Sequence, residues 1–498
     1  MLGERDPSDL VNYSGCGHTV SANNPVTRDL IVASLARWVE EYRVDGFRFD
    51  LASCLCRDAH GRPLPAPPLI KDLARHPVLS KVHLTAEPWD IGMYQVGSFP
   101  NWDVWGEWNG RYRDDARRFV RGDSGCKKAF ATRMAGSADL YKTGGRRWWH
   151  GVNFVTAHDG FSLYDLVSYA SKRNGDNGEG NRDGSDDNIS WNCGHEGGSD
   201  VSAALLGGGG GRHGGGGGGG GDVPAAVAAL RLRQARNFWC ALMLAQGVPM
   251  VVMGDELLQT HWGNNNWYGH DTRLAHMHWS GPLGGGEEEG EVAGGGAGGG
   301  DENAPPAATA ATSTMAGGAG KKAAASAAAA PSAASLALTE PARPPTPPDA
   351  ARADLLRFAS ELVGWRRGPA RHLFAGREAF LGDGDVTWHE RDWGNDESRF
   401  LAWTLHDTTA GAALGCGDAY IAFNAHPFLV DAPLPGPVGR WARLIDTALP
   451  APRDFTPGGN KGGVTTGSYG VQGHSCVVLI SNWREGGAGE GHSAASAA

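Results

Sequence analysis

The sequence predicts an α/β fold built on a mainly parallel sheet, followed by a smaller antiparallel β domain. The first prediction depends on two observations: helical segments alternate with short apolar segments over residues 25–256, and acidic residues follow the apolar segments. This alternation is typical of a parallel sheet that is either open or closed into a barrel. The second prediction depends on short alternating runs between glycine and proline turns over residues 369–482.

Helix–strand pairs account for the regular structure predicted within residues 1–368. Helix 25–43 precedes strand 44–50, which reads VDGFRFD, and a helix near 67–79 precedes strand 81–90, KVHLTAEPWD. The apolar face of the first helix consists of Leu30, Ile31, Leu35, Trp38 and Val39. The remaining predicted elements are strand 148–160, helix 225–247 and strand 248–256.

The C-terminal segment, residues 369–482, is predicted to be an antiparallel β-sandwich. Its strands are expected at 385–390, 399–405, 419–425, 441–447 and 474–481. Two inserts, 207–221 and 284–350, and the tail 483–498 are dominated by small or polar residues. Such segments bury too little apolar surface to offset the entropy of ordering the backbone, so we expect them to be disordered.

Composition excludes several classes of protein. The formal net charge is −10 and no basic run occurs, which argues against nucleic acid as a partner. No run of eighteen apolar residues occurs, so no membrane span is predicted. The eight cysteines form no CxxC pair, which predicts free thiols in a reducing compartment and neither a zinc site nor a disulfide framework.

Strand 44–50 carries charge into an otherwise apolar segment. Arg48 and Asp50 are two residues apart, so on a strand they point to the same side and can pair. Taken alone, this stretch fits a structural ion pair and an active site equally well, because buried charges are expensive unless they are paired.

Acidic residues also follow the other predicted strands. They are Glu87, then Asp159 after His158, and then Asp255 with Glu256. A structural ion pair does not explain carboxylates at four successive strand ends. Parallel α/β folds place their sites at these ends, which favours an active site. Asp255 and Glu256 could lie near a substrate or belong to a supporting network.

Isolated carboxylates at strand ends suit either metal ligation or glycoside hydrolysis. Retaining hydrolysis uses two carboxyl groups about 5 Å apart, of which one is an ionised nucleophile and the other an acid/base. A guanidinium beside a carboxylate favours its charged form, and Arg48 stands beside Asp50 in this way. Glu87 lies between Ala86 and Pro88, a less polar neighbourhood that suits a proton-holding acid.

The segments DGFRFD, AEPWD and FVTAHDG resemble signature regions of the α-amylase clan of glycoside hydrolases. NYSGCGHT, NWDVWGEWNG and GDELLQTHWGNNNWYGHD are similar to isoamylase-type debranching enzymes, and RGDSGCKKAFATRMAGSADLY looks most like those of plant and algal plastids. The resemblance covers about residues 10–282 and resumes at about 353. It implies part of a (β/α)8 barrel, about strands 4 to 8, with a last barrel helix near 358–368.

The resemblance also implies roles for individual residues. Asp50 corresponds to the nucleophile, Glu87 to the general acid/base and Asp159 to the stabiliser of the transition state. Arg48 and His158 would hold the sugar beside the scissile bond. Further substrate contacts are expected from Trp89 and the loop residues Asn264, Asn265 and Asn266, although packing and turn formation explain these residue types equally simply. No metal and no cofactor is implied.

The implied substrate is a branched α-glucan: amylopectin, glycogen or a limit dextrin. A homo- or hetero-oligomer with other isoamylase subunits and a location in the plastid stroma are further expectations. Two alternatives stay open, a non-catalytic glucan-binding or scaffold subunit and a branching transglycosylase. The family's first barrel strands and an upstream site motif have no counterpart here, so we expect residues 1–498 alone to be a poorly soluble, inactive fragment.

Overall fold

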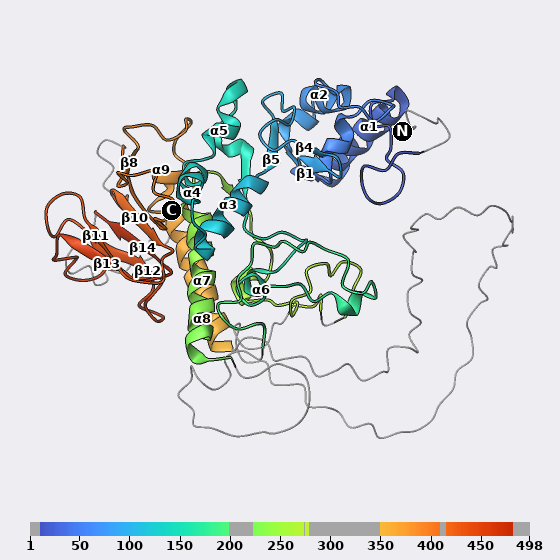
Figure 1. Ribbon diagram of the computed structural model, residues 1–498. Helices are drawn as coiled ribbons and strands as arrows, with labels where there is room; N and C mark the ends of the chain where they lie inside the picture. Colours follow the sequence, from blue (N-terminus) through green and yellow to red (C-terminus); the bar gives the residue numbers. More distant parts are fainter. Residues whose placement is uncertain (1–9, 199–222, 273, 278–348, 409–414, 482–498) are drawn as a thin grey trace, which may run out of the picture. The chain divides into compact units, whose positions relative to one another are not determined.

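The computed structural model describes residues 10–198, 223–272, 274–277, 349–408 and 415–481, which belong to one compact unit (Figure 1). The insert predicted at 207–221 and the tail at 483–498 lie outside the described residues. So does the insert predicted at 284–350, except for Asp349 and Ala350, which begin a helix. In the described part of the chain no helix is long and apolar enough to cross a membrane.

A five-stranded parallel sheet forms the first part of the fold. Its strands follow one another in chain order, so each pairs with the next one of the set. They are β1 (Gly46–Phe49), β2 (His83–Ala86), β5 (Trp105–Trp108), β6 (Gly151–Asn153) and β7 (Val248–Pro249). The short strands β3 (Trp89–Asp90) and β4 (Met93–Tyr94) form a separate antiparallel pair. The predicted α/β class is therefore confirmed.

Strand β5 is an element that the sequence analysis did not identify. Its indole Trp105 is buried against the rings of Phe49 and Phe99. The strand also carries Glu107, which is fully buried and hydrogen-bonded by Arg146 and by the backbone N–H of Gly97 at 2.6 Å. A glutamate in the middle of a four-residue strand conceals the apolar pattern from which strands are predicted.

All four strands predicted for this sheet are shorter than expected, and the last two differ most. A 3₁₀ turn at Trp148–His150 precedes β6, and from residue 154 onward the chain leaves the sheet. Strand β7 ends at Pro249, and a second 3₁₀ turn, Asp255–Leu257, follows it. The polar residues that follow these strands therefore lie on loops.

Helices precede, connect and follow the strands of this sheet. They are α1 (Pro25–Tyr42), α2 (Pro68–Arg75), α3 (Gly110–Arg121), α4 (Lys127–Met134), α5 (Ala138–Tyr141), α6 (Leu163–Leu166), α7 (Ala225–Leu244), α8 (Asp349–Arg367) and α9 (Arg371–Phe374). In α1 the predicted apolar face is only partly correct: Ile31, Leu35 and Val39 pack on the core. Leu30 and Trp38 are 70% and 47% exposed.

A five-stranded antiparallel sheet forms the C-terminal part. Its order is β12, β14, β10, β9, β8, and all five strands fall within the predicted segments. The strands are β8 (Val386–Trp388), β9 (Phe400–Leu405), β10 (Ala419–Asn424), β12 (Ala442–Asp446) and β14 (Ser475–Ile480). The two-stranded pair of β11 (Val430–Pro433) and β13 (Ser468–Val471) was not predicted.

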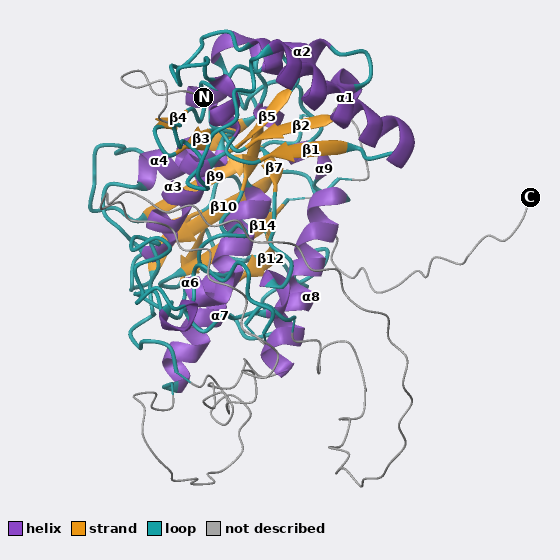
Figure 2. Cartoon of the chain, turned by 90° about the vertical axis from the view of Figure 1, so that its right-hand side faces the viewer, coloured by secondary structure: helices purple, strands orange, loops and turns teal. Residues whose placement is uncertain are grey.

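The two faces of this antiparallel sheet have different partners. Alternate residues such as Trp403, Phe423 and Val478 share one core with α7 and α8, which lie side by side (Figure 2). Residues on the other face pack with Ala432 of β11 and Val471 of β13. The predicted sandwich is thus a large sheet covered by helices on one face and by a small ribbon on the other.

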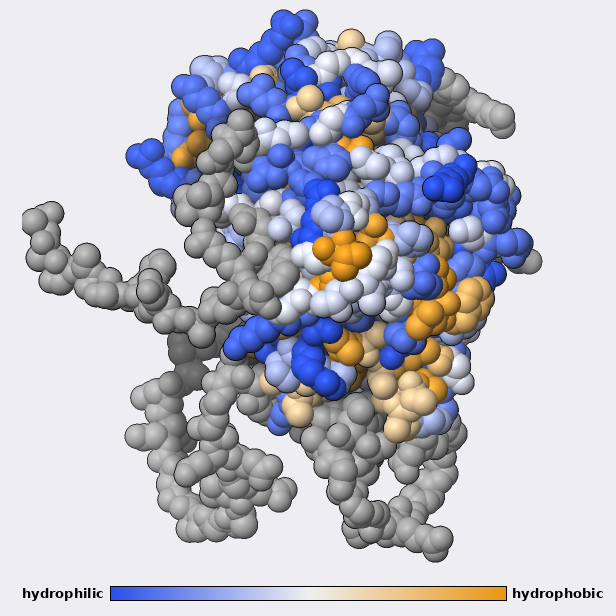
Figure 3. Space-filling model, turned by 90° about the vertical axis from the view of Figure 1, so that its left-hand side faces the viewer, coloured by the Kyte–Doolittle hydropathy of each residue, from blue (hydrophilic) through white to orange (hydrophobic). Residues whose placement is uncertain are grey.

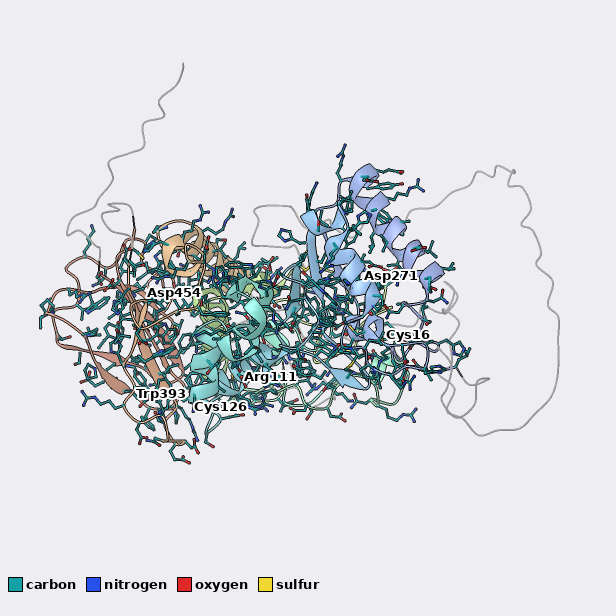
Figure 4. All side chains as sticks on the ribbon, turned by 90° about the horizontal axis from the view of Figure 1, so that it is seen from above. Cys16, Arg111, Cys126, Asp271, Trp393 and Asp454 are labelled. Carbon is teal, nitrogen blue, oxygen red and sulfur yellow. The ribbon has the colours of Figure 1, made fainter. Side chains whose placement is uncertain are left out.

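Ion pairs join the helices to the C-terminal sheet. Asp454, which is labelled in Figure 4, is fully buried between Arg236 of α7 at 3.0 Å and Arg357 of α8 at 2.5 Å. Lys127 of α4 reaches Glu390 beyond β8 at 2.7 Å.

The face of the molecule shown in Figure 3 is largely hydrophilic and carries some apolar patches. Loops of the C-terminal part expose the side chains of Phe428 and Leu429.

The Trp105→Ala substitution is expected to destabilise the protein by about 3–5 kcal/mol, because it leaves a cavity beside Phe49 and Phe99. Urea unfolding followed by circular dichroism measures this change. Trp149→Ala is the matched control because that indole is exposed, and it should lower the free energy of unfolding by about 1 kcal/mol or less. Equal losses in both variants would contradict the assignment of Trp105 to the core.

Candidate active site

Two carboxylates lie together because two parallel strands end side by side. Phe49 of β1 pairs with Ala86 of β2, so Asp50 and Glu87 follow neighbouring strand ends. The backbone N–H of Glu87 donates to the carbonyl of Phe49 at 3.0 Å, which extends the strand pairing as far as the site. The register of the sheet thus sets the spacing of the two acids.

The guanidinium of Arg48 binds both of these carboxylates. Its Nη1 lies 2.6 Å from Asp50 Oδ1, and its Nη2 lies 2.9 Å from Glu87 Oε2. The guanidinium also lies 4.4 Å from the ring centroid of Trp108, at the end of β5. The ion pair that the sequence predicts is therefore present, and it lies where β1 and β2 end.

The two carboxyl groups differ strongly in exposure. The side chain of Asp50 is 72% exposed, whereas that of Glu87 is 7% exposed. Burial raises the pKa of Glu87, although the N–H of Leu51, which donates at 2.8 Å, and the charge of Arg48 act in the opposite direction. Both acids are therefore paired with Arg48, but one is accessible whereas the other is buried with a raised pKa.

His158 and Asp159 approach the same place from the loop after β6. The ring of His158 stands edge-on to Trp108, with 5.8 Å between ring centroids. Its Nε2 lies 3.6 Å from Asp159 Oδ2, and the Asp159 side chain is 71% exposed. Trp108 thus contacts both Arg48 and His158, and it joins the loop after β6 to the ends of β1 and β2.

Trp89 has a packing partner in the structure. Its ring is stacked on that of Tyr94, with 6.0 Å between centroids and 14° between planes. The half-buried side chain also packs with Val96 and Leu140. This arrangement supports the packing explanation of Trp89 more directly than the sugar-stacking one.

The three asparagines at 264–266 belong to a hydrogen-bond network. Asn264 and Asn265 are each only 2% exposed, and their amide groups bind other parts of the protein. The donors and acceptors are Asn264 Nδ2 to Asn177 Oδ1 at 2.6 Å, Asn265 Nδ2 to Asn188 Oδ1 at 2.9 Å, Asn174 Nδ2 to Asn265 Oδ1 at 2.9 Å, and Asn266 Nδ2 to Asp183 Oδ2 at 2.8 Å. These contacts favour a structural role for Asn264 and Asn265 over direct substrate contact, because their amides already bind other residues of the protein.

A cavity of about 300 Å³ lies beside Asp159. Asn266 and the loop segment 184–189 line it, together with Arg113 and Asp114 of α3. The sequence analysis did not identify Arg113, Asp114 or the 184–189 segment. Helix α3 and this loop show no pattern that connects them with β6, so only the tertiary fold brings these residues to Asp159.

Asp255 lies in the 3₁₀ turn after β7 and is almost completely buried. Its carboxylate accepts hydrogen bonds from the hydroxyl of Thr156 and, at 2.9 Å, from the N–H of Leu163. Burial raises its pKa to about 6. These contacts place Asp255 in a supporting network. Among the described residues there is no cluster of three or more histidine, cysteine or acidic side chains that could hold a metal ion.

Comparison with known proteins gives similarity over nearly the whole chain. The family model "Isoamylase 1-3, C-terminal" matches residues 386–465. Isoamylase 3, chloroplastic, of Oryza sativa subsp. japonica is 42% identical over 96% of this chain and 49% of the relative. Isoamylase SU1, chloroplastic, of Zea mays is 38% identical over 91% of this chain and 48% of the relative. The chain therefore spans about half the length of these curated relatives.

Solved structures show the same fold at much lower sequence identity. A pullulanase from Bacillus acidopullulyticus superposes with a TM-score of 0.55 at 16% identity, over 95% of this chain and 42% of that one. Pullulanase type I from Bacillus subtilis in complex with maltose superposes with a TM-score of 0.54 at 16% identity. The match covers 96% of this chain and 49% of the pullulanase chain. These likenesses show an α/β fold followed by a C-terminal sheet.

The pKa of Asp255 generates a prediction about stability. The pKa of an aspartate in an unfolded chain is about 4, whereas burial raises the pKa of Asp255 in the folded protein to about 6. The folded state therefore binds the extra proton between these values, and the free energy of unfolding contributed by Asp255 falls as the pH rises through this window. Asp255→Asn removes this titrating group. The free energy of unfolding of the variant minus that of the unmodified protein should therefore rise by up to about 3 kcal/mol between pH 4 and pH 7.

Urea unfolding of both proteins at pH 4, 5, 6 and 7 measures this difference. Asp29→Asn is the control, because it removes a carboxylate that is exposed on α1. A stability difference for Asp255→Asn that is independent of pH would contradict the raised pKa.

Proposed function

We propose that the chain belongs with the isoamylase-type debranching enzymes, to which it is similar over most of its length, and that it hydrolyses α-1,6 branch linkages in starch- or glycogen-type glucans. The mechanism is a retaining double displacement. The observation that carries the proposal is the bridge from Arg48 to both Asp50 and Glu87, which holds an accessible carboxylate and a buried one on neighbouring strand ends. Retaining glycosidases need two carboxyl groups at such short spacing.

In the first step Asp50 attacks the anomeric carbon while Glu87 gives its proton to the oxygen of the breaking branch linkage. The leaving chain departs with a free 6-hydroxyl group, and the cleaved chain stays joined to Asp50 as a glycosyl ester. In the second step Glu87 takes a proton from water, and the resulting hydroxide attacks the same carbon and releases Asp50. The anomeric configuration is inverted twice and therefore retained.

The surrounding residues adjust the chemistry of the two carboxyl groups. Arg48 places a positive charge 2.6 Å from the carboxylate of the nucleophile Asp50. Burial raises the pKa of Glu87, which suits a group that must give a proton to the leaving oxygen. Asp159 and His158 are exposed at the same place, where they can bind the sugar hydroxyls and stabilise positive charge at the anomeric carbon.

The other predicted residues have different roles in this proposal. Asn264 and Asn265 hold the loop after β7, whereas Asn266 faces the cavity beside Asp159 and is available to a bound glucan. Trp89 stabilises the β3–β4 turn through Tyr94. The five parallel strands correspond to the last strands of a (β/α)8 barrel.

The names of the relatives support the substrate and the location. Two of them are called chloroplastic isoamylases, which favours branched plant glucan as the substrate and the plastid as the location. A Glycogen operon protein GlgX homolog of Mycobacterium tuberculosis is 47% identical over 56% of this chain and 35% of the relative, which favours glycogen as a further substrate. Assembly with other isoamylase subunits stays part of the proposal.

Proton NMR of fresh product tests the reaction as a whole. The chain is supplied with the upstream barrel segment, and incubation with glycogen or amylopectin should then release linear chains whose new reducing ends begin as the α anomer. Initial β anomer would contradict the two-step mechanism. New branch points instead of free linear chains would identify a branching transglycosylase, and glucan binding without any product would identify a scaffold subunit.

Asp50→Ala should reduce kcat on glycogen by at least about 10⁴-fold, because the residue forms the covalent bond, while glucan affinity should stay within a few-fold. Added azide fits the space left by the carboxylate, and it should react with α-maltosyl fluoride to give the β-glycosyl azide. Asp45→Ala provides a control on the same strand–loop segment. Unchanged turnover by Asp50→Ala would contradict its role as nucleophile.

Glu87→Gln should affect substrates according to their leaving groups. The rate on glycogen should fall by about 10²–10⁴-fold, because the leaving oxygen no longer receives a proton. Formation of the glycosyl-enzyme from α-maltosyl fluoride should change much less, because fluoride departs without protonation. Steady-state rates on glycogen and rapid-quench measurement of the fluoride burst give the comparison. Equal losses on both substrates would show that Glu87 is not the general acid.

A further inference from the structure

The loop that carries His158 and Asp159 is held at both ends by one carboxylate. Asp255 accepts the hydroxyl hydrogen of Thr156, where the loop begins, and the N–H of Leu163, where the loop ends, at 2.9 Å. Between these ends the N–H of Gly160 donates to the carbonyl of Asn265 at 3.0 Å. The two residues of the proposed site thus lie between three fixed points.

A second buried acid makes the reverse connection. Asp165, in α6 directly after this loop, accepts hydrogen bonds from the hydroxyl of Thr260 at 2.5 Å and from the N–H of His261 at 2.7 Å. Asp255 therefore belongs to the segment after β7 and binds the loop after β6. Asp165 follows that loop and binds the segment after β7. Both carboxylates are almost completely buried.

Other contacts hold the loop where it leaves the sheet. Arg117 of α3 donates from Nε to the carbonyl of Val155 at 2.8 Å, one residue before Thr156. Helix α8 lies behind the turn that carries Asp255, and Arg352 donates to the carbonyl of Leu257 at 3.2 Å. The turn that carries Asp255 is therefore packed against α8 and hydrogen-bonded to it.

We propose that Asp255 is a positioning residue for the debranching reaction, which sets the place of Asp159 and His158 by holding Thr156 and Leu163 together. The inference rests on the proposed function, because it takes Asp159 as a group that contacts the sugar in the transition state. A loop of this length with one end released can shift by about 1 Å, and a shift of that size lowers rates by about a hundredfold.

Holding two loops together with a buried carboxylate costs free energy, because the charged group is removed from water. Burial disfavours its charged form, as the raised pKa of Asp255 shows, whereas an amide or an apolar contact would carry no such penalty. A carboxylate, however, has two oxygens that can each accept a strong hydrogen bond from a different segment. This capacity to hold two points at once explains why an acid occupies position 255.

A double-mutant cycle of Asp255→Asn and Asp159→Asn in the full chain tests the proposal. Asp255→Asn alone should lower kcat for α-maltosyl fluoride by about 10–100-fold and leave KM within about threefold, with rates normalised by active-site titration. In the Asp159→Asn background the same change should lower kcat by less than about threefold, because the group that it positions is absent. Equal factors in both backgrounds would overturn the proposal, since they would show that Asp255 acts through the fold alone.

Substitutions at the partner residue keep the proposal testable if Asp255→Asn does not fold. Thr156→Val removes the hydroxyl and should reproduce the loss of kcat, whereas Thr156→Ser keeps the hydroxyl and should restore it to within about threefold. Asp454→Asn is the matched control, a buried acid whose partners, Arg236 and Arg357, lie outside loop 156–163. It should lower the midpoint of unfolding as Asp255→Asn does and show the same kcat loss with or without Asp159.

The possible failures are distinguishable. Full activity of the Asp159→Asn and Asp50→Ala variants would contradict the proposed function itself. Loss of activity in those variants, with Asp255→Asn and Thr156→Val both as active as the unmodified protein, would contradict only the positioning role.

Discussion

One guanidinium determines the arrangement of the candidate site. Arg48 binds Asp50 with one terminal nitrogen and Glu87 with the other, so it couples the ends of β1 and β2. Two carboxylates this close would repel each other, and the buried Glu87 would be costly to ionise without a counter-charge. The aromatic face of Trp108 in turn holds the guanidinium in place from β5. Three adjacent strands therefore contribute to a single ion cluster.

In the proposed reaction, the unequal exposure of the two acids assigns them different roles. The same arginine contacts both carboxylates, but only Asp50 is open to solvent and to a large substrate. Glu87 also accepts the N–H of Leu51, so its position is fixed by the backbone that follows Asp50. A structure with two equally exposed acids would offer no basis for dividing the roles of nucleophile and proton donor between them.

Polar groups hold the loops, while apolar packing holds the sheets. The loops after β6 and β7 are joined by the buried acids Asp165 and Asp255 and by the asparagine network at 264–266. Behind them α7 and α8 share one apolar core with the C-terminal sheet. Loops have few apolar side chains to bury, so directional hydrogen bonds and ion pairs define their positions. The C-terminal sheet thereby supports the helices on which these loops rest.

The sequence by itself determined the class of the fold, the strands β1 and β2 and the group of acids at their ends. Arg48 and Asp50 are adjacent on one side of a strand, and local spacing is enough to predict such a pair. Five C-terminal strands were predictable for the same reason, since their alternation is local. Strand β5 was not predictable, because the charged residue Glu107 conceals its apolar pattern. Glu107 pairs with Ala86 in the sheet, and its partner Arg146 is far along the chain. Tertiary structure alone decided that Asn264 and Asn265 are buried and that Asp255 spans a loop. Burial and long-range hydrogen bonds depend on which segments meet in space, and a local pattern of residue types carries no record of that.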